Sequence, residues 1–132
     1  MKRLYTFLIL LSLFLGSKAQ SIVFNGQAPK HEVRAVWLTT IGGIDWPNFY
    51  SQSPYSAEKQ KQELRSILDR LQQAKINTVL IQTRIRGTMI YPSQYEPWDG
   101  CLSGFPGKSP GYDALQFAID ECHKRGMELH AW

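Results

Sequence analysis

The sequence is poor in the residues from which metal and phosphate sites are built. Among its 132 residues there are two cysteines and three histidines. These are scattered along the chain, and no two groups have the spacing of a zinc site. A glycine-rich phosphate-binding loop and a nucleophile elbow are also missing from the sequence. We therefore expect neither a metal nor a cofactor.

No apolar run in the sequence is long enough to cross a bilayer. The longest, from Leu4 to Leu15, covers about a dozen residues, whereas a membrane-spanning helix needs about 20. It follows a basic start and precedes the small residues Ser17 and Ala19, which is the order of a secretory signal peptide. We predict a signal peptide over residues 1–19, and a short membrane anchor is the alternative. The mature protein is expected to be periplasmic or extracellular, without a stable membrane anchor.

Removal of this segment takes away the excess of positive charge. The whole chain has 15 basic and 11 acidic residues. Lys2, Arg3 and Lys18 fall within the predicted signal, so the mature chain has twelve basic residues, eleven acidic ones and a net charge of +1. Because no basic field remains, we expect no nucleic-acid partner.

The two cysteines raise the question of a disulfide in an exported protein. Cys101 lies in a glycine-rich segment. Cys122 lies on the apolar face of a predicted helix, at helical spacing with Ala118 and Ile119, where buried free cysteine is common. Spacing alone does not decide whether the two cysteines pair.

After a polar approach segment at 20–33, residues 34–132 alternate between short β-branched runs and helical patterns. In the first helix, Leu64, Leu68 and Leu71 share one apolar stripe. The order strand, helix, strand, helix, strand predicts βαβ units, and therefore an α/β fold with a parallel sheet. Strands are predicted over 34–40, over 78–84, beginning with the apolar run Thr78–Ile81, and over 127–132. Helices are predicted over 56–75 and 113–126, and a long loop over 85–111.

The helix ends carry recognisable capping residues. Ser56 is the expected N-cap of the first helix, and Asn77 is expected to adopt the left-handed conformation after it. Asp113 is the expected N-cap of the second helix, with Gln116 in the capping-box position and Gly126 at the end. Because no helix follows the third strand to cover it, we interpret the chain as a fragment of a longer fold.

Polar and aromatic side chains follow the carboxyl ends of the predicted strands, where α/β folds bind ligands. Counting by twos places Leu80, Gln82 and Arg84 on one face of the second strand. Aromatic rings stack on the apolar face of a sugar, while amide, guanidinium, carboxylate and imidazole groups bind its hydroxyls. The candidate sugar-binding residues are Trp37, Asp45, Trp46, Gln82, Arg84, Tyr91, Trp98, His130 and Trp132.

Each candidate also has a structural interpretation. Trp37 is equally compatible with a place in the core. Arg84 is compatible with a structural ion pair to Glu128, and His130 with a hydrogen-bonded structural histidine. The loop carboxylates are compatible with turns and caps, namely Asp45, Glu96 and Asp99.

Three segments carry motifs that occur in the same order in a known family: RAVWLTTIGGIDWP, INTVLIQTRIRGTMIYPSQYEPW and LSGFPGKSPGYDALQFAIDECHKRGMELHAW. They resemble the N-terminal part of the glycosyl hydrolase-like 10 family of exported bacterial proteins, over about residues 30 to 132. The resemblance implies a TIM-type (β/α)8 barrel, of which residues 34–132 would form about three βα units and stop inside strand 3. All nine candidates match the family's motif residues. Thr88 departs from it, because an acidic residue usually follows the loop glycine there.

The resemblance further implies hydrolysis of glycosidic bonds in an envelope or extracellular polysaccharide, such as a cell-wall glycan. That reaction uses two carboxylates, and in such barrels these usually stand on later strands. We therefore name no catalytic residue and expect this fragment alone to be inactive. The alternatives are a non-catalytic glycan-binding barrel domain and a small α/β domain that is complete as given.

Overall fold

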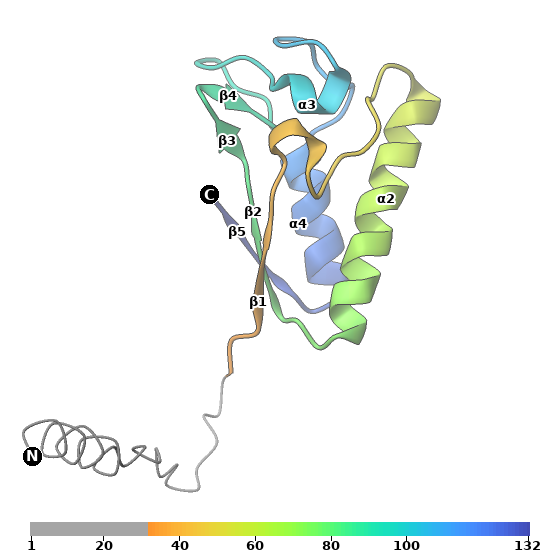
Figure 1. The fold of residues 1–132 in the computed structure, drawn as a ribbon, viewed down its shortest axis with the longest axis vertical. Helices are drawn as coiled ribbons and strands as arrows, with labels where there is room; N and C mark the ends of the chain where they lie inside the picture. The colour runs from red at the N-terminus through yellow and green to blue at the C-terminus, as the bar shows by residue number, and fades with distance from the viewer. Residues whose placement is uncertain (1–31) are drawn as a thin grey trace, which may run out of the picture. The chain divides into compact units, whose positions relative to one another are not determined.

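Residues 32–132 are the part of the chain that the computed structural model describes (Figure 1). The predicted signal peptide, most of the approach segment and His31 lie outside it. In chain order the elements are β1 (Ala35–Leu38), the short 3-10 helix η1 (Ile41–Gly43), α2 (Pro54–Gln73), β2 (Thr78–Ile81), β3 (Arg84–Ile85), β4 (Thr88–Met89), α3 (Gly100–Ser103), α4 (Ala114–Lys124) and β5 (Glu128–Ala131).

The main sheet has three parallel strands in the order β1-β2-β5, so the central strand comes second in the chain. Trp37, Leu80 and His130 stand side by side across it. Both long helices, α2 and α4, lie on one side of this sheet (Figure 1). The predicted α/β class with parallel strands is confirmed.

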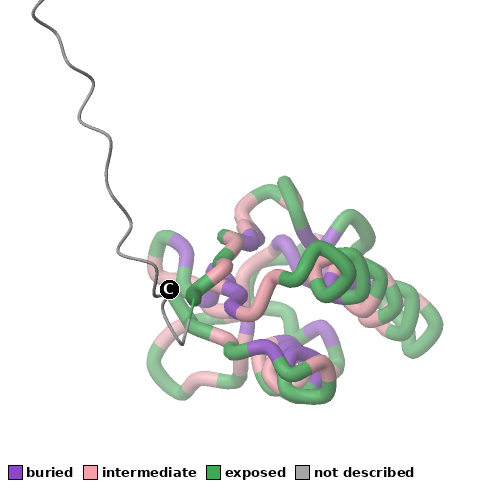
Figure 2. The backbone as a smooth tube through the Cα atoms, turned by 90° about the horizontal axis from the view of Figure 1, so that it is seen from below, coloured by how far each residue is buried: buried purple, intermediate pink, exposed green. Residues whose placement is uncertain are grey.

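The hydrophobic core lies between the sheet and the two helices. Leu38, Val79 and Ile81 point from the strands into it, and each is at most 3% exposed. The helices contribute a matching stripe, and Figure 2 shows buried and exposed positions alternating around them. Full burial of a side chain of this size contributes about 1.5 to 3 kcal/mol. The predicted strand alternation and helix stripe are confirmed at these positions, and the helix residues concerned are Leu64, Leu68, Ala118 and Cys122.

Helix α2 begins earlier than the sequence predicts. Its N-cap is Ser53, whose hydroxyl accepts the backbone N–H of Ser56, while Pro54 occupies the first helical position. Ser56 returns the contact, because its hydroxyl accepts the backbone N–H of Ser53. The assignment of Ser56 as N-cap is therefore wrong by three residues. Proline at the first helical turn explains the difference, since its missing N–H is not needed there.

The end of α2 also differs from the prediction. Lys75, not Asn77, takes the left-handed conformation, with φ of 62°. Asn77 instead joins two strands, because its Oδ1 accepts the backbone N–H of Arg34 at 2.8 Å. In α4 the predicted N-cap is confirmed, since the Asp113 carboxylate accepts the N–H of Gln116.

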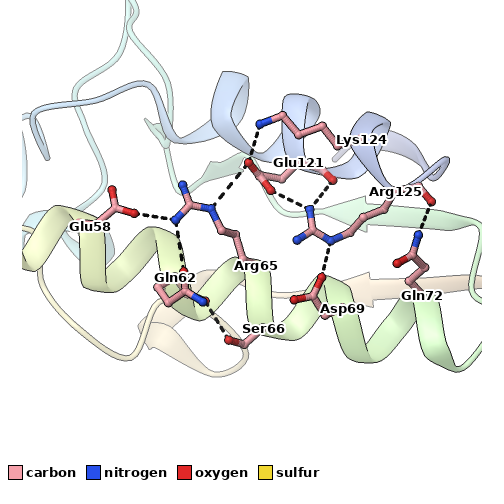
Figure 3. A network of polar contacts seen from close by, with 9 residues as sticks. All are labelled: Glu58, Gln62, Arg65, Ser66, Asp69, Gln72, Glu121, Lys124 and Arg125. Atoms are coloured by element: carbon pink, nitrogen blue, oxygen red, sulfur yellow. Dashed lines mark hydrogen bonds and ion pairs between the residues drawn. The ribbon is translucent and has the colours of Figure 1, made fainter.

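A network of charged side chains joins α2 to α4 on the solvent side (Figure 3). Its centre is Glu121, which is 5% exposed and accepts from Lys124 at 2.8 Å and Arg125 at 2.7 Å. Arg65 of α2 lies 3.7 Å from Glu121, and Arg125 reaches back to Asp69 at 2.7 Å. Hydrogen bonds from Lys124 and Arg125 lower the pKa of Glu121 to about 2, against the opposing effect of burial.

The segment predicted as one long loop contains three short elements beyond the carboxyl ends of the sheet (Figure 1). β3 and β4 form an antiparallel hairpin that turns at Arg86 and Gly87. Both turn residues have positive φ, 51° and 78°, as a two-residue type I′ turn requires. Strands of two residues are too short to leave a periodic pattern, which is why the hairpin is missed.

Cys101 in α3 and Cys122 in α4 are both buried and both free, so the two cysteines do not pair in this structure. Burial raises the pKa of the Cys122 thiol to about 11, which makes it unreactive at neutral pH. Within residues 32–132, no helix has the length and apolar character that a membrane crossing requires.

Candidate functional site

The face of the sheet opposite the helices is open to solvent. Trp37 on β1 is 60% exposed, and His130 on β5 is exposed as well. Leu80 lies between them in register and is half-buried. On the face toward the helices, Leu38, Val79 and Ile81 are buried, Val36 and Leu129 are half-buried, and Ala131 at the end of β5 is exposed. The predicted alternation in β1, with Trp37 pointing away from the helices, is confirmed.

Two indole rings meet on this open face. The ring centroids of Trp37 and Trp132 lie 5.0 Å apart with their planes at 78°, an edge-to-face arrangement. Trp132 is fixed from three directions. Its Nε1 donates to Leu80 O at 3.2 Å, its backbone N–H donates to Ile81 O, and its carbonyl accepts from Thr83. The pair is therefore an ordered aromatic surface at the carboxyl ends of β1 and β5.

His130 lies on the same face of the sheet, two residues before Trp132, and its imidazole is exposed. Its Nε2 lies 3.4 Å from Oε2 of Glu128, and the two side chains are 57% and 77% exposed. A contact this long between two exposed groups holds neither firmly. His130 is thus available to a ligand on the open face.

Arg84 and Glu96 form a bidentate ion pair at the carboxyl end of the central strand. Arg84 Nε donates to Glu96 Oε2 at 2.8 Å, and the second guanidinium nitrogen donates to Oε1 at 2.5 Å. The hydrogen bond from Arg84 lowers the pKa of Glu96 below its usual range. Glu128 is therefore the wrong partner in the alternative interpretation of Arg84. The Arg84 side chain is still 59% exposed, so its remaining donors face solvent.

Gln82 directly follows β2, which ends at Ile81, and its side chain is buried, whereas Arg84 is exposed. Its Oε1 accepts the backbone N–H groups of Thr40 and Ile41 at 3.1 and 2.9 Å. Gln82 thereby fixes the chain where it leaves β1. Its Nε2 has no protein partner within residues 32–132, so that group remains able to donate to a ligand.

Asp45 and Trp46 hold the loop that follows β1. Asp45 Oδ2 accepts the backbone N–H of Thr39 at 2.7 Å, which closes a turn. Trp46 is fully buried, and its Nε1 donates to the carbonyl of Gln60 in α2 at 3.0 Å. In this structure the Trp46 ring offers no surface to a ligand, and its place is in the core.

Tyr91 and Trp98 lie on the segment after β4. Both are half-buried, and Trp98 packs against the hydrophobic core and bridges to Met89. The structure thus brings Trp37, His130 and Trp132 together on the open face. Arg84 joins them through its backbone N–H, which donates to the Trp132 carbonyl at 3.4 Å. Gln82, Asp45 and Trp46 instead stabilise the backbone at the carboxyl end of β1.

Two side-chain contacts of this edge are missed by the sequence analysis, which interprets Glu96 and Asp99 as turn or cap residues. Glu96 instead orients Arg84, whereas the cap interpretation is confirmed for Asp99, the N-cap of α3. Thr88 Oγ1 lies 2.5 Å from Oδ2 of Asp99, whose Oδ1 accepts the N–H of Cys101. Burial opposes ionisation of Asp99, but these hydrogen bonds outweigh it and lower the pKa of the carboxyl. No local sequence signal marks either pairing. Within residues 32–132, no group of three or more potential ligands is arranged to hold a metal ion.

A family model and curated relatives both indicate that the chain is similar to glycosyl hydrolases. The glycosyl hydrolase-like 10 family model matches residues 32–132. Glycosyl hydrolase YngK of Bacillus subtilis is 43% identical over 124 residues, which cover 93% of this chain and 24% of that protein. Glycosyl hydrolase DigH of Escherichia coli is 42% identical over 121 residues, which cover 89% of this chain and 27% of that protein. The chain spans about a quarter of the length of these curated relatives.

Proposed function

Because this chain belongs to the glycosyl hydrolase-like 10 family, we propose that it takes part in the hydrolysis of glycosidic bonds. The observation that carries the proposal is the ordered pair of Trp37 and Trp132 on the open sheet face. Exposed indoles of this kind stack on the apolar face of a sugar ring. Arg84, oriented by Glu96, and His130 supply polar groups for its hydroxyls.

The proposed architecture is the N-terminal part of a (β/α)8 barrel, with about three βα units in this chain. Two observations support it. β1 and β5 form the two edges of the sheet, and each has a neighbour on one side only. The named relatives are about four times as long as this chain. Further strands would cover both edges, while the groups at the carboxyl ends of the strands would lie at the mouth of the barrel, where such folds bind ligands.

The proposed mechanism needs a proton donor and a second carboxylate beside the glycosidic bond. The carboxyl groups at this edge are poorly suited to donate a proton at neutral pH. The pKa values of Glu96 and Asp99 are both lowered by their hydrogen bonds, so these groups stay ionised. Asp45 is committed to its turn. We therefore propose that the catalytic acid is not among residues 32–132 and that the fragment binds glycan without cleaving it.

The proposed substrate is an envelope or extracellular polysaccharide. Its support is the predicted signal peptide over residues 1–19, which would export the protein to where such polysaccharides occur. A glycan-binding barrel without turnover is the second candidate function. It is favoured by the observation that the carboxylates of this edge all make structural hydrogen bonds.

One assay separates these functions. The full-length protein is incubated with a panel of envelope polysaccharides, and the release of new reducing ends is measured beside direct binding. Hydrolysis by the full-length protein, with binding but no hydrolysis by residues 20–132, is the expected result. Binding without hydrolysis by the full-length protein would favour the non-catalytic alternative. Cleavage by residues 20–132 would refute the proposal that the catalytic acid lies outside residues 32–132.

A further inference from the structure

A second hollow lies beyond the carboxyl end of β1, apart from the open face of the sheet. It has a volume of about 310 Å3, which is within the range of small-molecule sites. Its walls come from two segments, the chain around η1 with the residues after it, and the start of α3. Lining residues used below are Gly42, Gly43, Asn48, Tyr50 and Asp99. We refer to it as the Tyr50 hollow.

The Tyr50 ring is an exposed aromatic surface with a fixed backing. Tyr50 is 59% exposed, and its ring lies against Gly104, the residue that ends α3. Gly104 has φ of 83°, and a Cβ atom there would approach Tyr50 Cγ to 3.1 Å. The positive φ favours glycine at this position, and a side chain there would also crowd the Tyr50 ring. The ring is held on one side while the remainder is open to a ligand.

The polar groups of the hollow suit hydroxyls. The Asp99 carboxylate accepts from the Cys101 N–H, from Thr88 Oγ1 and from the Cys101 thiol, so about one of its roughly four lone-pair positions remains for another donor. Asn48 donates its Nδ2 to Glu63, which leaves its Oδ1 without a protein partner within residues 32–132. Both groups can accept hydrogen bonds from sugar hydroxyls.

The charge of the hollow restricts what it can bind. Among the residues that line it, Asp99 is the one charged side chain. Arg86 lies near enough to lower the pKa of Asp99 but does not line the hollow, so the lining itself carries a negative charge, which disfavours an anionic ligand and accepts from a neutral polyol. An aromatic ring beside acceptors therefore favours a neutral sugar unit over a uronic acid or a phosphorylated sugar.

We infer that the Tyr50 hollow is an additional subsite for a neutral sugar unit of the same glycan. This inference rests on the proposed function. The hollow includes Gly42 and Gly43, which follow β1 a few residues after Trp37, so both sites lie at the carboxyl edge of the sheet. A glycan that stacks on Trp37 and Trp132 has further units, and the subsite binds one of them. Affinity then rises with glycan length.

The experiment uses calorimetric titration of the full-length protein with neutral β-linked oligosaccharides of glucose and of N-acetylglucosamine, each as a disaccharide and as a longer chain. Tyr50→Ala is expected to lower the affinity for the longer chain by roughly three- to ten-fold, the loss of one stacking contact, and to leave the disaccharide unaffected. Tyr50→Phe keeps the ring and should keep the affinity. Tyr55→Ala is the matched control, because Tyr55 is 81% exposed on the first turn of α2 and does not line the hollow.

The outcomes separate this inference from the proposed function. If Tyr50→Ala leaves both affinities unchanged while Trp37→Ala lowers them, the subsite is refuted and the proposed function stands. If wild-type protein binds none of the oligosaccharides, both are refuted for neutral glycans. Thermal unfolding of each variant shows whether a loss of affinity is caused by misfolding. If Tyr50→Ala misfolds, the affinity of Tyr50→Ala is compared with that of Tyr50→Phe, which keeps the ring, to decide whether the ring binds the sugar.

Discussion

The indole rings of Trp37 and Trp132 meet edge to face, 5.0 Å apart, although Trp37 lies on one outer strand of the sheet, β1, and Trp132 directly follows the other, β5. The contact passes over β2, and Trp132 is tied to that strand by its Nε1 bond to Leu80 O. The three strands thus share one aromatic surface on the face that the helices leave open.

Replacement of Trp37 tests whether the exposed indole binds glycan. In the full-length protein we expect Trp37→Ala to lower glycan affinity about ten-fold, because one stacking surface is lost. Calorimetric titration measures the change. Tyr95→Ala is the matched control, since Tyr95 is 93% exposed on another segment. Unchanged affinity together with a marked loss of stability would instead place Trp37 in the core of the complete protein.

Replacement of Gln82 tests whether its side chain stabilises the backbone that follows β1. Gln82→Ala removes the acceptor of the Thr40 and Ile41 N–H groups and leaves them unsatisfied. We expect the free energy of unfolding to fall by about 2 to 4 kcal/mol, measured by urea denaturation. Gln73→Ala, at the exposed end of α2, should change it by less than about 0.5 kcal/mol. Equal effects of the two substitutions would contradict the role of Gln82.

The Glu121 network predicts a dependence of stability on pH. The pKa of Glu121 is about 2 in the folded protein and near 4.5 without these contacts. A lowered pKa gives stability that is complete above 4.5 and is lost as the pH falls toward 2. Glu121→Gln should therefore lower the free energy of unfolding at neutral pH by about 1 to 2 kcal/mol, less than the full shift implies because solvent screens the cations.

The measurement is thermal unfolding of wild type and variant across this acidic range. The difference between them should shrink as the pH falls and vanish near the folded pKa. Asp120→Asn is the control, because Asp120 is the exposed neighbour of Glu121 and lies outside the ion pairs. A difference that stays constant over the range would mean that the effect of Glu121→Gln is not electrostatic.

The predicted signal peptide gives a separate expectation. Expression of the whole gene in a bacterial host should yield an exported protein whose N-terminus is Gln20, identified by mass spectrometry of the mature chain. Ala19→Arg should block this cleavage, because signal peptidase requires a small residue there. A protein that keeps Met1 and stays inside the cell would refute both the export and its expected location.

The regular elements were predictable because they depend on local periodicity. Val79 and Ile81 alternate along β2, and Leu64 and Leu68 recur along α2, so the buried face of each follows from spacing. The starting residue of α2 was not predictable in the same way. Ser53 and Ser56 are both good N-caps, and the choice depends on where Pro54 fits.

The edge of the sheet was harder to predict because its contacts join residues far apart in sequence. Gln82 was expected to bind a sugar, and no local pattern showed that its side chain would be buried as the acceptor of two backbone N–H groups after β1. Arg84 was paired with Glu128 in one interpretation, whereas the chain beyond the β3–β4 hairpin brings Glu96 to it. Trp46, in a polar segment, gave no sign that Gln60 of α2 would bury it.

The most direct test of the central claim is a crystal structure of the full-length protein with an oligosaccharide from its substrate. The account predicts a sugar ring stacked within van der Waals distance of Trp37 or Trp132, with Arg84 or His130 hydrogen-bonded to its hydroxyls. An oligosaccharide bound elsewhere, with those indoles packed beneath other protein segments, would contradict it.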